Sequence, residues 1–207
     1  FFYYYIFLLG WQSLNMAALM MKGSFLNKAV TSSRQILGRC SNYRWMTMIA
    51  EGAKLPGAVN FMIVGEAGPQ EVSISEVFAG KKVAVCGLPG AFTPTCHATH
   101  LPGFIEKSSE FRAKGIDSVV CISVNDPFVM KSWGSALGAE GKVALLADGG
   151  AQFTAAAGLG FDTAGFGGLR MKRLSMLVDD GVVTKLNVED GGAFTEISSA
   201  DTLLKQI

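Results

Sequence analysis

Three short apolar segments in the C-terminal part of the chain limit the folds that it can adopt. They span residues 82–88, 118–124 and 142–147, and Gly80 and Pro89 bound the first of them. Their apolar residues run continuously instead of alternating with polar ones, which is typical of strands covered on both faces of a sheet. Helices must then lie above and below these strands, so we expect an α/β fold.

A second pair of strands is expected nearer the C-terminus. Residues 174–178 and 182–188 flank the dipeptide Asp180-Gly181, which is a strong signal for a β-hairpin. The sheet is therefore expected to be mixed, with central strands and a terminal hairpin.

Helical spacing is found between the first two expected strands. Pro102 lies inside that stretch and should bend the helix or separate its first turn, and Lys114-Gly115 should end it. The apolar residues at helical spacing are Leu101, Phe104, Ile105 and Phe111.

Two further helices complete the expected domain. One spans residues 127–137, with Asp126 as its N-cap and Pro127 at its first position. The other is the last helix, where Ser198 and Asp201 resemble a capping box. Its apolar residues are Ala200, Leu203, Leu204 and Ile207. Together these elements predict an α/β sandwich with helices on both faces of a mixed central β-sheet.

The pattern divides the chain into an N-terminal leader, residues 1–50, and one domain, residues 51–207. Residues 1–9 are apolar but too short for a membrane span, and no basic residue precedes them as in a secretory signal. Because Met16 is the first methionine, we expect translation to begin there and residues 1–15 to come from upstream translation.

Residues 16–50 have the composition of a transit peptide: basic, serine-containing and without an acidic residue before Glu51. The basic residues are Lys22, Lys28, Arg34, Arg39 and Arg44. We expect import into an organelle, the mitochondrion before the chloroplast. The alternatives are a disordered basic tail, or translation from Met46 or Met48, which would give a cytoplasmic protein.

Charge and cysteine content argue against several classes of protein. A net charge of +1 gives no reason to expect nucleic acid as a partner. The cysteines are too few for a disulfide-dense secreted framework, and the absence of a Cys-x-x-Cys pair argues against a zinc knuckle or a dithiol motif. We interpret them as individual thiols in a reducing compartment; they are Cys40, Cys86, Cys96 and Cys121.

The most informative stretch is residues 89–96, Pro-Gly-Ala-Phe-Thr-Pro-Thr-Cys, directly after the first strand. Ligands of α/β proteins usually bind at such a strand end. Thr93 is expected to cap a helix whose first position is Pro94. Cys96 then occupies the third helical position, where free N–H groups and the positive end of the helix dipole are concentrated.

This position matters because only a thiolate is a competent nucleophile. An ordinary cysteine is mostly protonated at neutral pH, whereas a helix N-terminus together with a nearby cation favours the thiolate. Arg170 and Arg173 are the candidates for that cation, behind the glycine-rich residues 165–168. We therefore expect Cys96 to be ionised and reactive.

The other cysteines and the histidines have simpler interpretations. Cys86 and Cys121 lie inside apolar strands and are expected to be small core residues. Cys96, His97 and His100 could suggest a metal site, but three ligands within one helical turn make a poor tetrahedral site. We expect His97 to lie on the surface and His100 to pack or to form a hydrogen bond.

Residues 89–96, followed by His-Leu-Pro-Gly-Phe at residues 100–104, resemble the active-site signature of type II (atypical 2-Cys) peroxiredoxins. Residues 123–130, 173–176 and 186–189 resemble further blocks of that family. The resemblance covers roughly residues 54–207 and is highly specific.

The resemblance implies a thioredoxin-like fold and a thiol peroxidase that reduces hydrogen peroxide and alkyl hydroperoxides. We expect this chemistry to need no metal or organic cofactor, and we expect no membrane as a partner. Cys96 would be the peroxidatic cysteine, oxidised to a sulfenic acid. Thr93 would position peroxide and thiolate, and Pro89 would shield the site. Arg173 would be the family's guanidinium, with Arg170 as its neighbour. The family also implies a homodimer.

Regeneration of the thiol leaves two alternatives open. Cys121 matches the resolving cysteine of plant members of this family, but a disulfide from inside an apolar strand would require local unfolding. The other alternative is attack by an external thiol, from glutathione, glutaredoxin or thioredoxin.

Other functions fit the residues less well. A cysteine hydrolase would need a base with room for a substrate carbonyl, and His100 lies on the same turn as Cys96. A disulfide reductase would need a cysteine where Thr93 stands. A redox-sensing or chaperone-like binding protein remains the alternative, although it would not explain why Thr93, Cys96 and Arg173 are combined.

Overall fold

The computed structural model describes residues 47–190 and 192–207, and the expected leader therefore lies almost wholly outside the described residues. A mixed seven-stranded sheet has the order β2-β1-β5-β4-β3-β8-β9. Its strands are β1 (Asn60–Gly65), β2 (Gly68–Ser73), β3 (Lys82–Leu88), β4 (Ser118–Ser123), β5 (Ala144–Ala147), β8 (Leu174–Asp179) and β9 (Val182–Val188). A second sheet pairs β6 (Gly160–Asp162) with β7 (Leu169–Met171).

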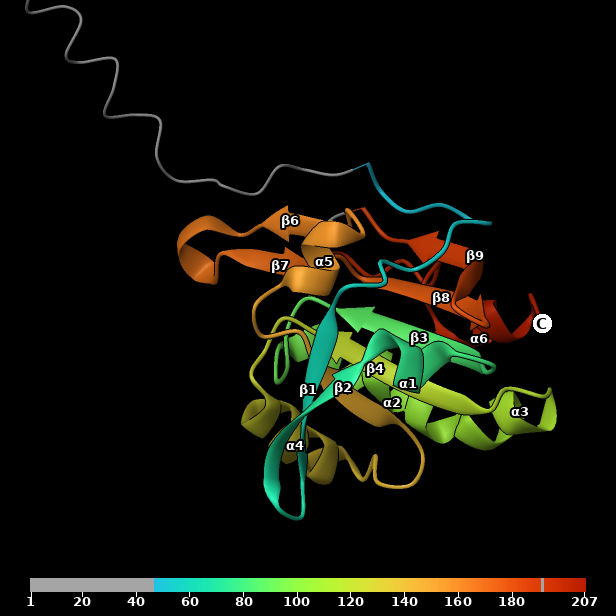
Figure 1. Cartoon of the computed structure of the whole chain (residues 1–207), viewed down its shortest axis with the longest axis horizontal. Helices are drawn as coiled ribbons and strands as arrows, with labels where there is room; N and C mark the ends of the chain where they lie inside the picture. The colour runs from blue at the N-terminus through green and yellow to red at the C-terminus, as the bar shows by residue number, and fades with distance from the viewer. Residues whose placement is uncertain (1–46, 191) are drawn as a thin grey trace, which may run out of the picture. The chain divides into compact units, whose positions relative to one another are not determined.

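The three continuous apolar segments form the middle of the large sheet. β3, β4 and β5 are parallel to one another, and β8 is antiparallel to β3. Figure 1 shows the β8–β9 hairpin beside β3, joined through Asp180 and Gly181, which both have positive φ angles. The mixed sheet and its terminal hairpin are therefore confirmed.

The sequence patterns missed the β1–β2 hairpin. β2 lies at the edge of the sheet, and its residues are exposed or half-buried. It also contains Pro69, which is tolerated only at such an edge. An edge strand buries little, so its sequence lacks the apolar signal that marked the central strands.

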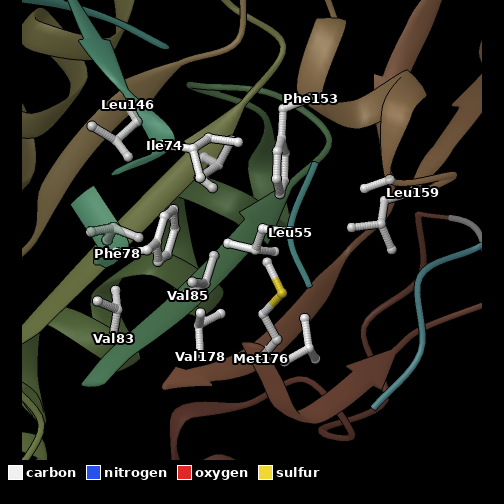
Figure 2. Close-up of a cluster of buried hydrophobic side chains, with 14 of the residues drawn as sticks. Leu55, Ile74, Phe78, Val83, Val85, Leu146, Phe153, Leu159, Met176 and Val178 are labelled. Atoms are coloured by element: carbon white, nitrogen blue, oxygen red, sulfur yellow. The ribbon is translucent and has the colours of Figure 1, made fainter. Parts of the chain in front are cut away.

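The sheet has a hydrophobic cluster on each face. In β3, Val83 and Val85 belong to one cluster, whereas Ala84, Cys86 and Leu88 belong to the other. Successive side chains of a strand point to opposite faces, so a strand apolar at every position must be covered twice. Figure 2 shows the first cluster, in which Phe78 packs near the two valines.

Helices supply the outer layers, as expected. They are α1 (Ile74–Phe78), the π-helical turn η1 (Cys96–His100), α2 (Leu101–Glu106), α3 (Ser108–Ala113), α4 (Pro127–Leu137), α5 (Gln152–Ala156), the 3-10 turn η2 (Ala164–Phe166) and α6 (Ala200–Leu204). α1 and α5 contribute to the first cluster, and α2, α3, α4 and α6 to the second. Within the described residues, each helix is too short or too polar to cross a bilayer.

Helix α4 has the predicted bounds and the predicted cap. The Asp126 side chain accepts hydrogen bonds from the backbone N–H groups of Phe128 and Val129, at 2.9 and 3.0 Å. Gly138 ends the helix in the left-handed conformation, with φ of 64°. Such a residue is most often glycine because it lacks a Cβ.

Pro102 separates two helical segments of different register. The Leu101 N–H donates to the Cys96 carbonyl, which is the wider π-helical spacing. Pro102 has no N–H for the Ala98 carbonyl, and its ring would clash with that carbonyl in an α-helix. The π turn relieves this clash, and turns of this kind are frequent at functional sites.

The predicted cap of the last helix was wrong by one residue. The N-cap of α6 is Ser199, whose hydroxyl accepts from the Thr202 N–H at 3.1 Å. Ser198 is instead buried, and its hydroxyl donates to the Glu189 carboxylate at 3.0 Å. Two adjacent serines give the same sequence signal, and only the tertiary contact with Glu189 distinguishes them.

Candidate active site

Cys96 lies in the first turn of the helix that follows β3. Helical structure begins at Pro94, so Cys96 is the third helical residue, and its side chain is fully buried. The preceding loop is held by Asn125, whose side-chain oxygen accepts from the Ala91 N–H at 2.9 Å. Phe92 in this loop has a φ of 58°, a strained conformation for a non-glycine residue that is typical of functional loops.

Thr93 stands at the predicted cap position, but its side chain does not cap the helix. Its backbone carbonyl accepts from the His97 N–H at 2.9 Å, which begins the helix. Its hydroxyl donates to the Gly90 carbonyl at 2.8 Å. The hydroxyl proton is thereby directed back into the loop, and the oxygen lone pairs remain able to accept a hydrogen bond from a ligand.

Arg173 is the cation next to Cys96. It follows β7 and precedes β8, its side chain is 3% exposed, and its Nη2 lies 3.5 Å from the Cys96 Sγ. Its Nε donates to the backbone carbonyl of Ala193 at 3.0 Å, and its Nη2 to that of Gly192 at 3.1 Å. The guanidinium also lies over the Phe194 ring, 5.8 Å from the centroid.

The charge of Arg173 has no carboxylate partner. Among residues 47–190 and 192–207, none of the ion pairs includes it. Its carbonyl partners are dipoles without net charge, and a buried charge is stable only when it is paired or well hydrogen-bonded. The group in contact with it that can become an anion is the Cys96 thiol.

His100 lies on the other side of the same guanidinium. Its Nδ1 is 3.2 Å from Nη1 of Arg173, and its Nε2 is 2.7 Å from the backbone carbonyl of Ser198. Burial lowers the pKa of His100 to about 4, with Arg173 acting in the same direction, while the Ser198 carbonyl and Glu189 oppose the shift. The imidazole is therefore neutral at pH 7.

Glu189 fixes the segment that carries Ser198. Its carboxylate accepts from the backbone N–H and hydroxyl of Ser198, at 3.1 and 3.0 Å, and from those of Thr195, at 3.2 and 2.6 Å. Burial disfavours its ionised form, but these hydrogen bonds are stronger and hold the pKa of Glu189 below its ordinary value. It is therefore an anion with four local donors.

His97 was expected on the surface, and the structure contradicts this in part. Its side chain is half-buried, and its Nδ1 accepts from Trp133 Nε1 at 3.0 Å. Its ring also stacks on Phe92, with centroids 5.7 Å apart. Phe92 and Trp133 therefore cover part of the histidine ring, which helical spacing alone does not reveal.

A cavity of about 450 Å³ opens beside these groups. Its lining includes Pro89, Thr93 and Arg173, which the sequence had singled out, and the rings of Phe161 and Phe166. The cavity is thus lined both by the site residues after β3 and before β8 and by aromatic rings from the β6–β7 region.

Arg170 also lines this cavity, but it does not share the position of Arg173. Its Nη1 donates to the backbone carbonyl of Val124 at 2.7 Å. Between the two arginines that were candidates for the cation, the one that contacts the Cys96 sulfur is Arg173.

Cys121 and Cys86 lie together in the sheet beneath the site. They are directly opposite in the register of β4 and β3, and both are fully buried as free thiols. Burial and a hydrogen bond with Cys121 raise the pKa of Cys86 well above its ordinary value. Both belong to the same hydrophobic cluster as Cys96, which agrees with their interpretation as core residues.

The structure therefore brings Pro89, Thr93, Cys96 and Arg173 to one place, and leaves Cys121 inside the sheet. Sequence reasoning missed the contact between His100 and Arg173, the role of Asn125 in holding the loop, and the Glu189 hydrogen bonds. The first two contacts join residues 73 and 34 positions apart, and the Glu189 hydrogen bonds depend on how the segment after β9 folds back. The residue types alone gave no signal of any of them.

Comparison with known proteins gives a consistent result. The family model described as Redoxin matches residues 50–204. The chain is 46% identical to Peroxiredoxin-2B of Arabidopsis thaliana, over 78% of this chain and 100% of that protein. It is also 46% identical to the chloroplastic Peroxiredoxin-2E-2 of Oryza sativa subsp. japonica, over 77% of this chain and 72% of that one.

Solved structures agree with the curated relatives. The reduced Prx3 of Vibrio vulnificus, crystallised in complex with hydrogen peroxide, is 50% identical to this chain. The match covers 77% of this chain and 99% of that one, with a TM-score of 0.73. Peroxiredoxin 5 of Alvinella pompejana matches at 29% identity over 76% of this chain and 96% of that one, with a TM-score of 0.65.

Proposed function

The chain belongs to the redoxin family, among the type II peroxiredoxins, and on that premise we propose that Cys96 is the peroxidatic cysteine of a thiol-dependent peroxidase. Thiol-dependent peroxidase activity is what the relatives support. The observation that carries the assignment to Cys96 is the buried Arg173 guanidinium, whose Nη2 lies 3.5 Å from the sulfur and which has no carboxylate partner among the described residues.

The proposed reaction begins with the Cys96 thiolate, which the positive charge of Arg173 stabilises. The sulfur attacks the nearer peroxide oxygen, a bond forms between sulfur and that oxygen, and the O–O bond breaks. Two electrons pass from sulfur to the peroxide, the departing alkoxide or hydroxide takes up a proton, and Cys96 becomes a sulfenic acid. Arg173 and Thr93 provide positive charge and hydrogen bonds where the O–O bond breaks.

As substrates we propose hydrogen peroxide and alkyl hydroperoxides. The relative from Vibrio vulnificus was crystallised with hydrogen peroxide. A cavity of about 450 Å³ is much larger than that molecule, and Phe161 and Phe166 give part of its wall an apolar surface that suits an alkyl group. Pro89 at its edge is proposed to shield the sulfur from water.

For regeneration we favour an external thiol, from glutathione, glutaredoxin or thioredoxin, over Cys121. Cys121 is fully buried in a strand that pairs with β3 on one side and β5 on the other. A disulfide with Cys96 would require the strand or the helix start to move, since disulfide geometry is narrow. A Cys121→Ser variant tests this: turnover with each reductant should be unchanged, and loss of turnover would make Cys121 the resolving cysteine.

A homodimer is proposed as well, on the basis of family membership. Large apolar side chains exposed near the site support it: Phe92 is 51% exposed and Phe128 is 58% exposed. Phe92 lies near Trp133 of α4, with ring centroids 6.3 Å apart, and Phe128 is on the same helix. Sedimentation of the wild type against a Phe128→Asp variant would test this surface.

For location we propose an organelle. The basic, acid-free composition of residues 16–50 supports import, and we keep the mitochondrion as the expectation from composition. Two relatives are named chloroplastic, which supports the plastid as the alternative. Fusing residues 1–50 to a fluorescent protein, with residues 51–207 alone as the control, would distinguish mitochondrion, plastid and cytoplasm.

The experiment that tests the function is peroxide consumption with dithiothreitol, comparing the wild type with Cys96→Ser. The proposal requires the variant to lose the activity, whereas Cys121→Ser should keep it. Equal rates for the wild type and Cys96→Ser would favour the alternative, a redox-sensing or chaperone-like binding protein.

A further inference from the structure

We propose that His100 is a positioning residue for the peroxidase reaction: in one fixed neutral tautomer, it holds the Arg173 guanidinium against Cys96. This inference rests on the proposed function. It assigns to His100 a role that acts through Arg173 and not by contact with the peroxide.

The tautomer follows from the partners of the two ring nitrogens. The Ser198 backbone carbonyl can only accept a hydrogen bond, so Nε2 of His100, 2.7 Å away, must carry a proton and donate it. Arg173 can only donate, so Nδ1, 3.2 Å from Nη1, must carry a lone pair and accept. One neutral tautomer satisfies both contacts, whereas a doubly protonated ring would set an N–H against the guanidinium.

The position of His100 on the π turn makes this contact useful. Cys96 and His100 are the first and last residues of η1, and Arg173 contacts both of them, Cys96 through Nη2 and His100 through Nη1. The histidine therefore fixes one arm of a planar group whose other arm faces the sulfur. Because the guanidinium is rigid, orienting one arm orients the other.

The ring itself has little freedom to turn. Phe104 of α2 packs edge-on against it, with centroids 5.6 Å apart, and Phe194 lies 5.1 Å away. Phe194 also lies beneath the guanidinium of Arg173. One aromatic side chain thus contacts both members of the pair and limits where each can move.

The carbonyl that sets the tautomer is itself fixed. Glu189 accepts hydrogen bonds from both the backbone N–H and the hydroxyl of Ser198. The chain of contacts therefore runs from Glu189 through Ser198 and His100 to Arg173, and ends at the Cys96 sulfur. Cys86 also faces the ring, with Sγ 3.9 Å from Nε2, which is long for a strong contact.

Two substitutions separate acceptance at Nδ1 from mere filling of space. His100→Leu removes the Nδ1 acceptor and fills its place with an apolar side chain of similar size. His100→Asn ends near the place of Nδ1 and can offer its amide oxygen to Arg173. We expect peroxide consumption by His100→Leu to be about tenfold slower or worse, since a hydrogen bond to a charged group is worth that much. His100→Asn should recover most of that loss.

A double-mutant cycle with Arg173→Gln tests whether His100 acts through the arginine. We expect His100→Leu to slow the wild type and to have little further effect when Arg173 is already Gln. Equal effects in both backgrounds would overturn the proposal. So would an Asn variant that folds and is as slow as the Leu variant.

The tautomer gives a readout that does not depend on activity or on folding of a variant. Nitrogen-15 NMR of the wild type at pH 7 should show His100 with a protonated Nε2 and an unprotonated Nδ1. The opposite tautomer, or a ring protonated on both nitrogens, would overturn the proposal. A wild type without peroxidase activity would instead overturn the proposed function and leave the tautomer as an independent test.

Discussion

Among single residues, one buried positive charge distinguishes the surroundings of Cys96. Arg173 is 3% exposed and uses its guanidinium to contact two backbone carbonyls, one imidazole nitrogen and one sulfur. Cys96 is the one group among these partners that can become an anion, and this is why we assign the proposed reaction to it.

Replacing Arg173 by Gln should therefore slow peroxide consumption by about 10²- to 10³-fold, the loss typical of removing one group that stabilises transition-state charge. The matched control is Arg170→Gln, because Arg170 lines the same cavity but donates to the Val124 carbonyl instead of the sulfur. The rate with hydrogen peroxide measures both. Losses of equal size would contradict the assignment of Arg173 as the group that acts on sulfur.

His100 should make the stability of the fold dependent on pH. Its pKa is about 4 in the folded chain, against 6.5 when unperturbed, so between these values the unfolded chain binds a proton that the folded chain does not. Stability from this group is therefore complete above pH 6.5 and falls as the pH drops towards 4, by roughly 2 to 3 kcal/mol.

Urea unfolding at pH 7 and pH 4.5 measures this loss, with His100→Asn as the control that lacks the titrating group. Glu189 has a lowered pKa, so its contribution to the stability of the fold also decreases as the pH falls. Burial raises the pKa of Asp148, so its contribution increases as the pH falls. Glu189 and Asp148 are present in the wild type and in His100→Asn alike, so the difference in stability loss between these two proteins is due to His100. Equal losses in the wild type and the variant would contradict a buried neutral histidine.

The sequence located the reacting residues more readily than their supports. Thr93, Pro94 and Cys96 are local to one helix start, and physical rules for helix starts apply to them directly. The contacts of Arg173 with Cys96 and with His100 join parts of the chain that only the fold brings together. Which of two neighbouring arginines faces the sulfur could not be derived from spacing, and the family resemblance supplied the choice.

At the scale of elements, β3 connects the core with the site. Its alternate residues enter the two hydrophobic clusters, and its end delivers the loop that leads to Cys96. Gly87, near that end, faces side chains so close that a Cβ would lie 2.6 Å from Leu174 Cγ and 2.8 Å from Met171 Sδ. Because Gly87 has no side chain, Leu174 of β8 can pack directly against the backbone of β3.

Gly87→Ala should therefore lower the free energy of unfolding by about 1 to 3 kcal/mol, the usual penalty for overpacking a core. The control is Gly57→Ala, because a Cβ there meets nothing within 4 Å and Gly57 has no positive φ angle. Chemical denaturation of both variants gives the comparison. A Gly87→Ala protein as stable as the control would show that the Leu174 and Met171 side chains can move to accept the methyl group.

The elements with a strong local signal in the sequence were the predictable ones. The bounds of β3, β9 and α4 match the sequence patterns. β3 has a continuous apolar run, β9 follows the Asp180-Gly181 turn, and α4 has a proline at its first position. The β1–β2 hairpin and the short β6–β7 hairpin gave no such pattern, since β2 is at an edge and β6 and β7 are three residues each. The π turn could not be predicted from the apolar periodicity, because it depends on where Pro102 lies relative to Cys96.

In the molecule as a whole, Cys96, which we propose to react, lies in the helix start after β3, whereas Cys86 and Cys121 lie within the strands of the sheet. The three thiols differ in their surroundings. Cys96 contacts a guanidinium, whereas Cys86 and Cys121 are free thiols opposite each other on neighbouring strands in the core. The raised pKa of Cys86 keeps it a thiol at neutral pH. The fold therefore predicts that oxidation is confined to one of these three residues.

The most direct test is to identify which cysteine becomes a sulfenic acid. The reduced protein is treated with one equivalent of hydrogen peroxide in the presence of dimedone, which traps sulfenic acids, and its peptides are analysed by mass spectrometry. We predict an adduct on Cys96 and unmodified Cys86 and Cys121. An adduct on Cys86 or Cys121 with Cys96 unmodified, or no adduct although peroxide is consumed at the same rate by Cys96→Ser, would contradict the account.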